Sequence, residues 1–107
     1  MAVQALSDDV WPEVLSSSLP VLVGFWAEWC LPSHGLAATL EAADERLDGR
    51  AAVGSVDVDR NPELARRYRV QGLPTILLLE GGRETLRRVG LLGRDDLLAL
   101  IAGRGWS

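Results

Sequence analysis

Apolar residues along the chain follow two patterns, short uninterrupted runs and a longer stretch with helical spacing. The run over residues 21–27 is typical of a strand buried on both faces, as at the centre of a sheet. From Leu36 to Leu47, apolar side chains then recur every three or four residues, which predicts an amphipathic helix. Gly49 is a plausible stop for that helix, because glycine tolerates the left-handed backbone of helix ends.

The segments on either side of these two elements predict further helices and a second strand. A first helix is expected near the start of the chain, capped by Ser7 and limited by Pro12. Alternate valines within residues 51–59 predict a strand, and Asn61 followed by Pro62 predicts the start of a short helix. The early strands therefore alternate with helices, which implies parallel pairing through crossover connections.

The second half of the chain predicts a hairpin and a last helix. Pro74 precedes an apolar run over residues 75–79, and Gly81-Gly82 separates that run from residues 83–89. Asp95-Asp96 then opens an amphipathic helix. The whole order fits an α/β protein with a mixed sheet and helices on both faces.

Composition narrows the function classes. The chain has 107 residues, which suits a single domain over residues 1–107. A net charge of −4 argues against a nucleic-acid-binding surface. One cysteine and one histidine allow neither an internal disulfide nor an ordinary zinc site, so we expect no metal and no cofactor. No apolar run approaches the ~18 residues of a membrane span, and the start lacks signal-peptide features, so we expect a cytoplasmic monomer that binds no membrane.

The single cysteine, Cys30, lies between the buried run and the long helix. At a helix N-terminus, unpaired N–H groups and the positive end of the helix dipole lower the pKa of a thiol. Because the thiolate is the nucleophile of disulfide exchange, this position makes Cys30 a candidate nucleophile. The alternative is a small buried hydrophobic residue, and spacing alone does not choose between the two.

Several separated segments resemble the thioredoxin family. Residues 25–32, Phe-Trp-Ala-Glu-Trp-Cys-Leu-Pro, resemble its active-site segment, which carries Trp-Cys-Gly-Pro-Cys at this place. Further matches follow in the family's order, namely Val-Asp-Val-Asp at 56–59, Asn-Pro at 61–62, Val-Gln-Gly-Leu-Pro-Thr at 70–75 and Val-Gly at 89–90. The resemblance covers nearly the whole chain and implies the thioredoxin fold, a central mixed sheet flanked by helices on both faces.

The resemblance also implies a role for Cys30 and a substrate groove around it. Cys30 matches the attacking cysteine, and Pro74 matches a cis-proline that faces the active-site sulfur. Leu73 would pair its backbone with an extended substrate segment, a form of strand addition. The residues expected to form the groove are Trp29, Leu31, Pro32, Leu73, Pro74, Gly90 and Leu91.

Three positions depart from the family pattern. Ser33 stands where the family has its second, resolving cysteine, Gly24 where it usually has a buried aspartate, and Ser55 where a lysine often neighbours that aspartate. A serine hydroxyl does not attack a disulfide, so we expect a mixed disulfide on Cys30 that an outside thiol must resolve. Without a second thiol, a buried proton acceptor has no role and its charge only costs stability.

Three hypotheses about function follow. The first is a thiol–disulfide oxidoreductase of the protein-disulfide-reductase type that serves cell redox homeostasis, with protein disulfides as substrates and a thioredoxin reductase or a low-molecular-weight thiol as reductant. The second is a redox-inactive binding or chaperone-like module that keeps the groove. The third is a dithiol thioredoxin in which Ser33 is an engineered trap. Other departures around the site leave this last question open; they are Gly24, Leu31, Ala38 and Ser55.

Other residues suggest weaker chemistry. His34 follows Cys30 at helical i,i+4 spacing, so an imidazolium could stabilise the thiolate, although an exposed polar residue is the simpler interpretation. The arginines at 66, 67 and 69 are typical of a solvated helix face. Trp11 packs a helix or lies exposed, and Trp106 belongs to the tail of the chain.

Overall fold

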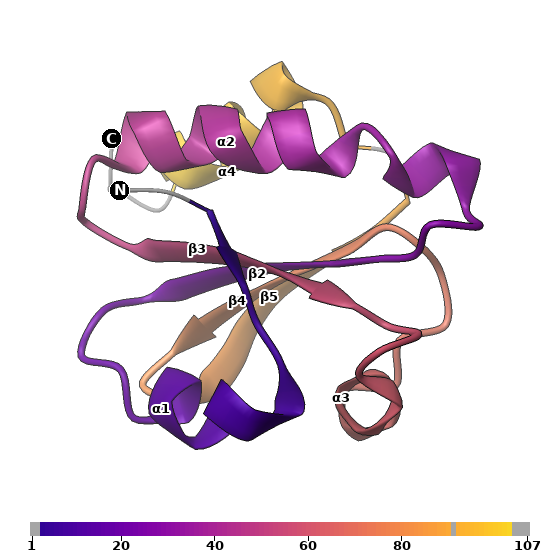
Figure 1. Cartoon of the computed structure of the whole chain (residues 1–107). Helices are drawn as coiled ribbons and strands as arrows, with labels where there is room; N and C mark the ends of the chain where they lie inside the picture. Colours follow the sequence, from indigo (N-terminus) through magenta and orange to yellow (C-terminus); the bar gives the residue numbers. More distant parts are fainter. Residues whose placement is uncertain (1–2, 91, 104–107) are drawn as a thin grey trace.

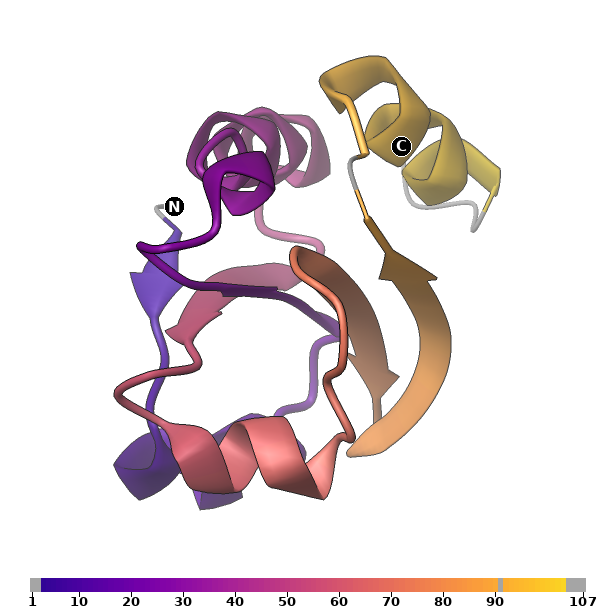
Figure 2. The same cartoon turned by 90° about the vertical axis from the view of Figure 1, so that its right-hand side faces the viewer.

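A computed structural model describes residues 3–90 and 92–103, in which five strands form one mixed sheet (Figures 1 and 2). The strand order is β1-β3-β2-β4-β5, with β3 parallel to β1 and β2, and β4 antiparallel to β2 and β5. This topology confirms the predicted mixed sheet and α/β class. The strands are β1 (Gln4–Ala5), β2 (Val21–Trp26), β3 (Ala52–Asp57), β4 (Thr75–Glu80) and β5 (Arg83–Val89).

Helices cover both faces of the sheet, as predicted. Figure 1 shows α2 and α4 on one face and α1 and α3 on the other. Their bounds are Trp11–Leu15 for α1, Leu36–Leu47 for α2, Pro62–Arg67 for α3 and Arg94–Gly103 for α4, with 3-10 turns at Asp8–Val10 (η1) and Leu31–Ser33 (η2). Within residues 3–90 and 92–103, no helix is long and apolar enough to cross a membrane.

The central strand β2 separates two apolar clusters because its side chains alternate between the faces. Leu22 packs with α2 and α4 in one cluster, whereas Val23 and Phe25 pack on the side of α1 and α3. All three side chains are at least 98% buried. The uninterrupted apolar run in the sequence thus corresponds to a strand that contributes to both halves of the core, and its carboxyl end leads to Cys30.

One of the two predicted helix ends differs from the structure. The Ser7 side chain caps no helix; the chain forms η1 first, and α1 starts beside Pro12, whose fixed φ suits a first helical turn. The backbone N–H of Asp8 instead donates to the Asn61 side chain at 3.1 Å, a contact between residues far apart in sequence. The end of α2 agrees with the predicted stop, because the C-cap residue Asp48 has φ of +46° and Gly49, which follows it, has φ of +84°.

The end of α3 places the loop that leads to Pro74. The N–H of Val70 donates to the Ala65 carbonyl at 2.9 Å, and the N–H of Arg69 donates to the Arg66 carbonyl at 3.1 Å. This pair of bonds is a Schellman ending, which requires a left-handed residue at Arg69. Arg69 has φ of +52°, a conformation that glycine adopts with less strain than arginine.

Replacing Arg69 with glycine is therefore expected to raise the free energy of unfolding by about 0.5–1 kcal/mol. Arg69 is exposed, so the loss of its side chain removes little packing. Urea unfolding measures the change, and Arg67→Gly, within the last turn of α3, is the matched control expected to lower stability by about 1 kcal/mol. An unchanged or lower stability for Arg69→Gly would show that the arginine side chain offsets its backbone strain.

Candidate active site around Cys30

Cys30 follows the carboxyl end of β2 and is the N-cap residue of η2. The helix α2 begins only at Leu36, so the helix N-terminus expected at Cys30 belongs to a 3-10 turn and not to the long helix. Tight i→i+3 bonds form first, because the N–H of Ser33 donates to the Cys30 carbonyl at 3.0 Å. Pro32 fits this turn, since an N–H at that position would have no helical partner. A short 3-10 turn thus separates the thiol from α2.

The structure brings the thiol against the loop before β4. The half-buried Cys30 thiol donates to the Leu73 carbonyl across 3.8 Å, and the Leu73–Pro74 peptide bond is cis. The N–H of Gly90 donates to the Pro74 carbonyl at 2.8 Å, which holds the end of β5 beside this loop. Cys30, Leu73, Pro74 and Gly90 therefore come together from three separated segments, while the predicted groove residue Leu91 lies outside the described residues.

A cavity of about 280 Å³ opens beside the thiol. Of the predicted groove residues, Trp29 and Leu73 line it, whereas Leu31 and Pro32 are exposed on η2 and do not. The opposite wall was not predicted, and its residues come from the segment after β3, from α3 and from the loop after it. The full lining is Trp29, Cys30, Val58, Ala65, Val70, Gln71 and Leu73.

Large apolar side chains are exposed around this cavity. Leu31 is 76% exposed, Trp29 68% and Val89 60%. A Cβ atom at Gly72 would lie 2.7 Å from Val89 Cγ1, so Val89 lies against the loop that carries Leu73. Exposed apolar side chains that gather at one place on a protein commonly mark a binding surface.

The Trp29 indole is held by a side chain that was not among the predicted site residues. Its Nε1–H donates to the Asp59 carboxylate at 3.1 Å. The second aspartate of this segment, Asp57, accepts a hydrogen bond from the Asp59 N–H at 2.9 Å and so stiffens the turn. The Val-Asp-Val-Asp motif pointed to this segment. The Trp29–Asp59 contact itself joins residues 30 positions apart, so no local sequence pattern predicts it.

Ser33 is buried, with its hydroxyl bonded only to backbone groups. The hydroxyl accepts a bond from the Ala27 N–H at 3.2 Å and lies 2.9 Å from the Ala27 carbonyl and 2.7 Å from the Cys30 carbonyl. A hydroxyl has one proton, so it donates to one of these carbonyls at a time. Serine is therefore well accommodated here, and its bonds brace the turn that carries Cys30.

Beneath the site, apolar side chains fill the space above Gly24. A Cβ atom at this glycine would lie 2.7 Å from Leu36 Cδ2 and 2.9 Å from Leu40 Cδ1. Ser55 pairs directly with Gly24 in the register of β2 and β3. The two departures from the family pattern are thus neighbours on adjacent strands, and α2 packs closely over the first of them.

His34 bonds to the backbone and not to the Cys30 thiol. His34 Nε2 bonds to the Glu28 carbonyl, and its side chain is exposed. Because a carbonyl oxygen only accepts, Nε2 carries a proton in this contact. His34 thus closes the turn around Cys30 from outside, and the structure gives it no contact with the thiol.

The remaining candidates have structural roles. Trp11 is buried in the core, where its Nε1–H donates to the Tyr68 hydroxyl at 3.0 Å. Arg66 pairs with Glu63, and the guanidinium of Arg67 lies 5.6 Å from the centre of the Tyr68 ring, so the arginines of α3 form an exposed face, as expected. Trp106 lies outside the described residues. Among residues 3–90 and 92–103, no group of three or more His, Cys, Asp or Glu side chains could hold a metal.

Comparisons with known proteins agree with this geometry. A family model for thioredoxin matches residues 2–103. A thioredoxin of Acidithiobacillus ferridurans is 39% identical over 101 residues, which cover 94% of each chain. A bifunctional thioredoxin reductase/thioredoxin of Mycobacterium leprae is 44% identical over 86 residues, or 80% of this chain and 19% of that protein. The crystal structure of a chloroplastic thioredoxin z has a TM-score of 0.85 at 32% identity, covering 100% of this chain and 97% of that one. The chain therefore belongs to the thioredoxin family of thiol–disulfide oxidoreductases.

Proposed function

We propose that the protein exchanges disulfides through Cys30 alone, by a monothiol route. The observation that carries this proposal is the contrast between the two positions of the turn. The Cys30 thiol lies beside an open cavity, whereas the Ser33 hydroxyl is buried and bonded to backbone. The position of Cys30 therefore supports attack on a substrate, and position 33 has no sulfur that could release the substrate afterwards.

The reaction has two displacement steps. The Cys30 thiolate attacks one sulfur of a substrate disulfide, the S–S bond breaks, and the other sulfur leaves as a thiolate that takes a proton from solvent. An outside thiolate then attacks the mixed disulfide and frees Cys30. A serine oxygen is too weakly acidic and too poor a nucleophile toward sulfur for this second step. Gly24 also leaves the site without the carboxylate that would accept a proton from a resolving thiol.

The surroundings of Cys30 support a protein disulfide as the substrate. Trp29, Leu31 and Val89 offer apolar surface to an unfolded or extended segment, and the Leu73 backbone lies beside the sulfur for strand addition. Members of the family generally act on protein disulfides and are reduced by thioredoxin reductase, and one relative's name joins the two activities. We propose a thioredoxin reductase or a low-molecular-weight thiol as the reductant. A cytoplasmic location and a monomeric state stay predictions.

A disulfide dye tests the proposal. The protein is mixed with 5,5′-dithiobis(2-nitrobenzoate), and the release of thionitrobenzoate is followed by absorbance. We expect one equivalent per chain, an adduct on Cys30 by mass spectrometry, and a faster reaction in the folded protein than in the same protein unfolded in urea. Added low-molecular-weight thiol should free the chain for another turnover. Cys30→Ala is the control and should show no adduct.

The alternative of a redox-inactive binding module draws on the same exposed apolar side chains. It predicts that folding does not accelerate the reaction of Cys30 with the dye. A folded protein that reacts more slowly than the unfolded chain would overturn the monothiol proposal and favour this module. Repeated turnover without added thiol would overturn it as well, because Cys30 alone cannot release its own adduct.

A further inference from the structure

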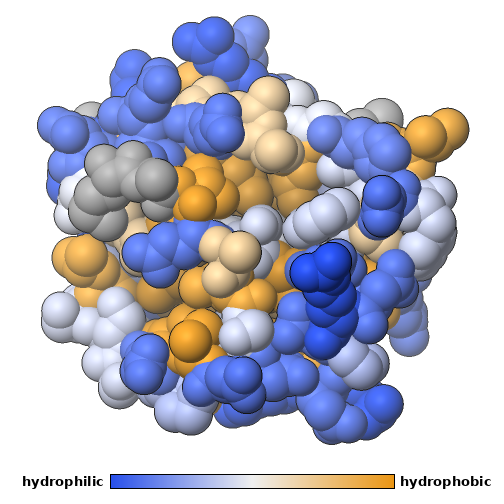
Figure 3. Space-filling view, viewed as in Figure 1, coloured by the Kyte–Doolittle hydropathy of each residue, from blue (hydrophilic) through white to orange (hydrophobic). Residues whose placement is uncertain are grey.

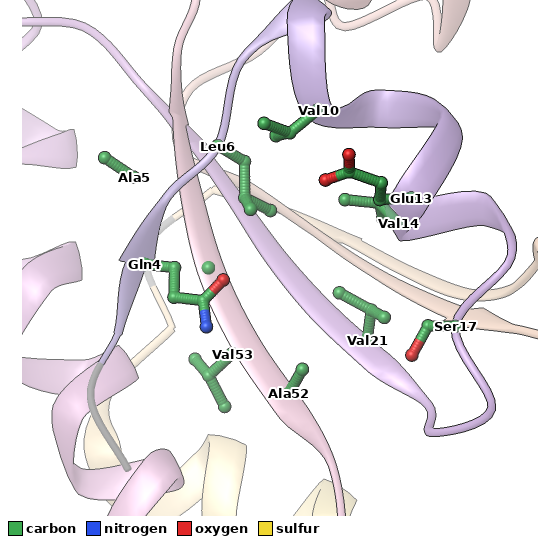
Figure 4. Close-up of a pocket in the computed structure, with 11 residues that line it drawn as sticks. Gln4, Ala5, Leu6, Val10, Glu13, Val14, Ser17, Val21, Ala52 and Val53 are labelled. Atoms are coloured by element: carbon green, nitrogen blue, oxygen red, sulfur yellow. The ribbon is translucent and has the colours of Figure 1, made fainter.

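A second cavity lies at the opposite end of β2 from Cys30. It has a volume of about 240 Å³ and opens between β1, α1 and the first residues of β2 and β3 (Figure 4). Cys30 follows the carboxyl end of β2, whereas this cavity is lined by Val21, the first residue of that strand. The proposed disulfide chemistry makes no use of it.

Small residues on β3 keep the cavity open. Gly54 has no side chain, and a Cβ atom there would collide with Leu6, so Leu6 packs flat against the strand backbone. Ala52 also leaves space at the edge of the cavity. The floor is apolar because Leu6, Val14 and Val21 belong to the core cluster on this side of the sheet. Figure 3 shows apolar side chains at the surface on this face, surrounded by polar ones.

Polar side chains stand at the rim. In Figure 4, the Gln4 amide from β1 and the Glu13 carboxylate from α1 face the cavity from opposite sides. Among residues 3–90 and 92–103, the Glu13 carboxylate has no hydrogen-bond or ion-pair partner. The cavity thus combines an apolar floor with a carboxylate that is free to bind a cation.

The segment that forms β1, η1 and α1 carries only acidic charges. Residues 1–45 contain no lysine or arginine, and Asp8 and Asp9 of η1 directly precede α1. The arginine closest in sequence to the β3 wall is Arg50. Its guanidinium donates to the carbonyls of Leu47, at 2.8 Å, and Arg46 at the end of α2. An anionic ligand would therefore meet like charge at this rim, whereas a cation would meet its counter-charge.

We propose that this cavity binds a small organic cation, an alkyl- or aryl-ammonium ion. Its apolar body would lie on Leu6, Val14 and Val21, and its ammonium group would donate to the Glu13 carboxylate at the rim. The cavity is somewhat smaller than the range of about 300–1,000 Å³ for drug-sized ligands, so a body of one ring or a short alkyl chain suits it.

Three probes with similar bodies and different charges test the proposal on the full chain. They are the 2-phenylethylammonium ion, neutral 2-phenylethanol and the 3-phenylpropanoate anion, each titrated into nitrogen-15-labelled protein and followed by amide chemical shifts. We expect saturable shifts over β3 and α1 with the cation, binding about fivefold weaker with the alcohol, and none with the anion. Equal affinity for all three, or no saturable shift with the cation at millimolar concentration, would overturn the proposal.

Two variants place the ligand in the cavity. Glu13→Gln keeps the size of the rim side chain and should weaken cation binding about fivefold, whereas Glu41→Gln, on α2 across the sheet, should leave it unchanged. Ala52→Phe should fill the space and abolish binding of every probe. Binding that survives Glu13→Gln at full strength contradicts the proposal even where Ala52→Phe fails to fold. Cys30→Ala should bind the cation normally, so the outcome is independent of the disulfide chemistry.

Discussion

A chain carrying Ser33→Cys is expected to release a mixed disulfide from Cys30 at least about a hundredfold faster than the parent when no thiol is added. The new sulfur would lie in the same tight turn, where the Ser33 hydroxyl now lies 2.7 Å from the Cys30 carbonyl. Attack within one chain replaces attack by a dilute outside thiol, and such positioning is worth many orders of magnitude in effective concentration. With the disulfide dye, the variant should release two equivalents of thionitrobenzoate per chain, against one for the parent.

Ser33→Ala is the matched control for this experiment. It removes the hydroxyl bonds to Ala27 and Cys30 without supplying a thiol, so its adduct should be as long-lived as that of the parent. The release rate of Ser33→Cys should rise with pH, because Gly24 provides no buried carboxylate and the resolving thiol must give its proton to solvent. A variant that stops at one equivalent would mean that a sulfur at position 33 cannot reach Cys30.

Introducing an aspartate at position 24 is expected to lower the free energy of unfolding by at least about 3 kcal/mol at neutral pH. Two costs combine. The new Cβ atom would lie 2.7 Å from Leu36 Cδ2, and the carboxylate would be buried against leucines without the cation that a lysine at position 55 could supply. Urea unfolding measures the loss against a total stability that is usually about 5–15 kcal/mol for a domain.

The pH dependence separates the two costs of Gly24→Asp. Burial raises the pKa of a carboxyl in the folded state, so the protonated form is favoured on folding and the electrostatic penalty grows as pH rises through that pKa. Gly24→Ala carries the steric cost alone and should lose about 1–3 kcal/mol at every pH. A Gly24→Asp variant as stable as the parent would show that Leu36 and Leu40 move aside, and adding Leu36→Ala should otherwise recover part of the loss.

Much of the fold could be predicted because burial dictates the pattern along the chain. The run that became β2 and the helical spacing that became α2 both follow directly from which side chains enter the core. The hairpin was equally predictable from the Gly81-Gly82 pair. Both glycines have positive φ, which a tight two-residue connection requires. These are local rules, and tertiary structure did not override them.

Two of the misses involve partners that are distant in sequence. Beside Ser7, whose side chain caps no helix, the Asp8 N–H donates to Asn61, and a sequence window near the start of the chain cannot contain that residue. The cavity beside Cys30 likewise takes Val58 and Ala65 from elements whose approach only the folded chain defines. The simpler interpretation of His34 agrees with the structure, since its imidazole is exposed and bonds to the Glu28 carbonyl.

The packing above Gly24 also restricts the order in which this sequence could change. Truncating a buried leucine such as Leu36 or Leu40 first would leave a cavity, at a cost of about 2–5 kcal/mol. Introducing the carboxylate first would create the clash described above. Each route therefore begins with a step that removes a large part of a domain's stability before any benefit to disulfide chemistry exists. A cysteine at position 33 requires a single substitution, whereas the residue at position 24 is constrained by its neighbours.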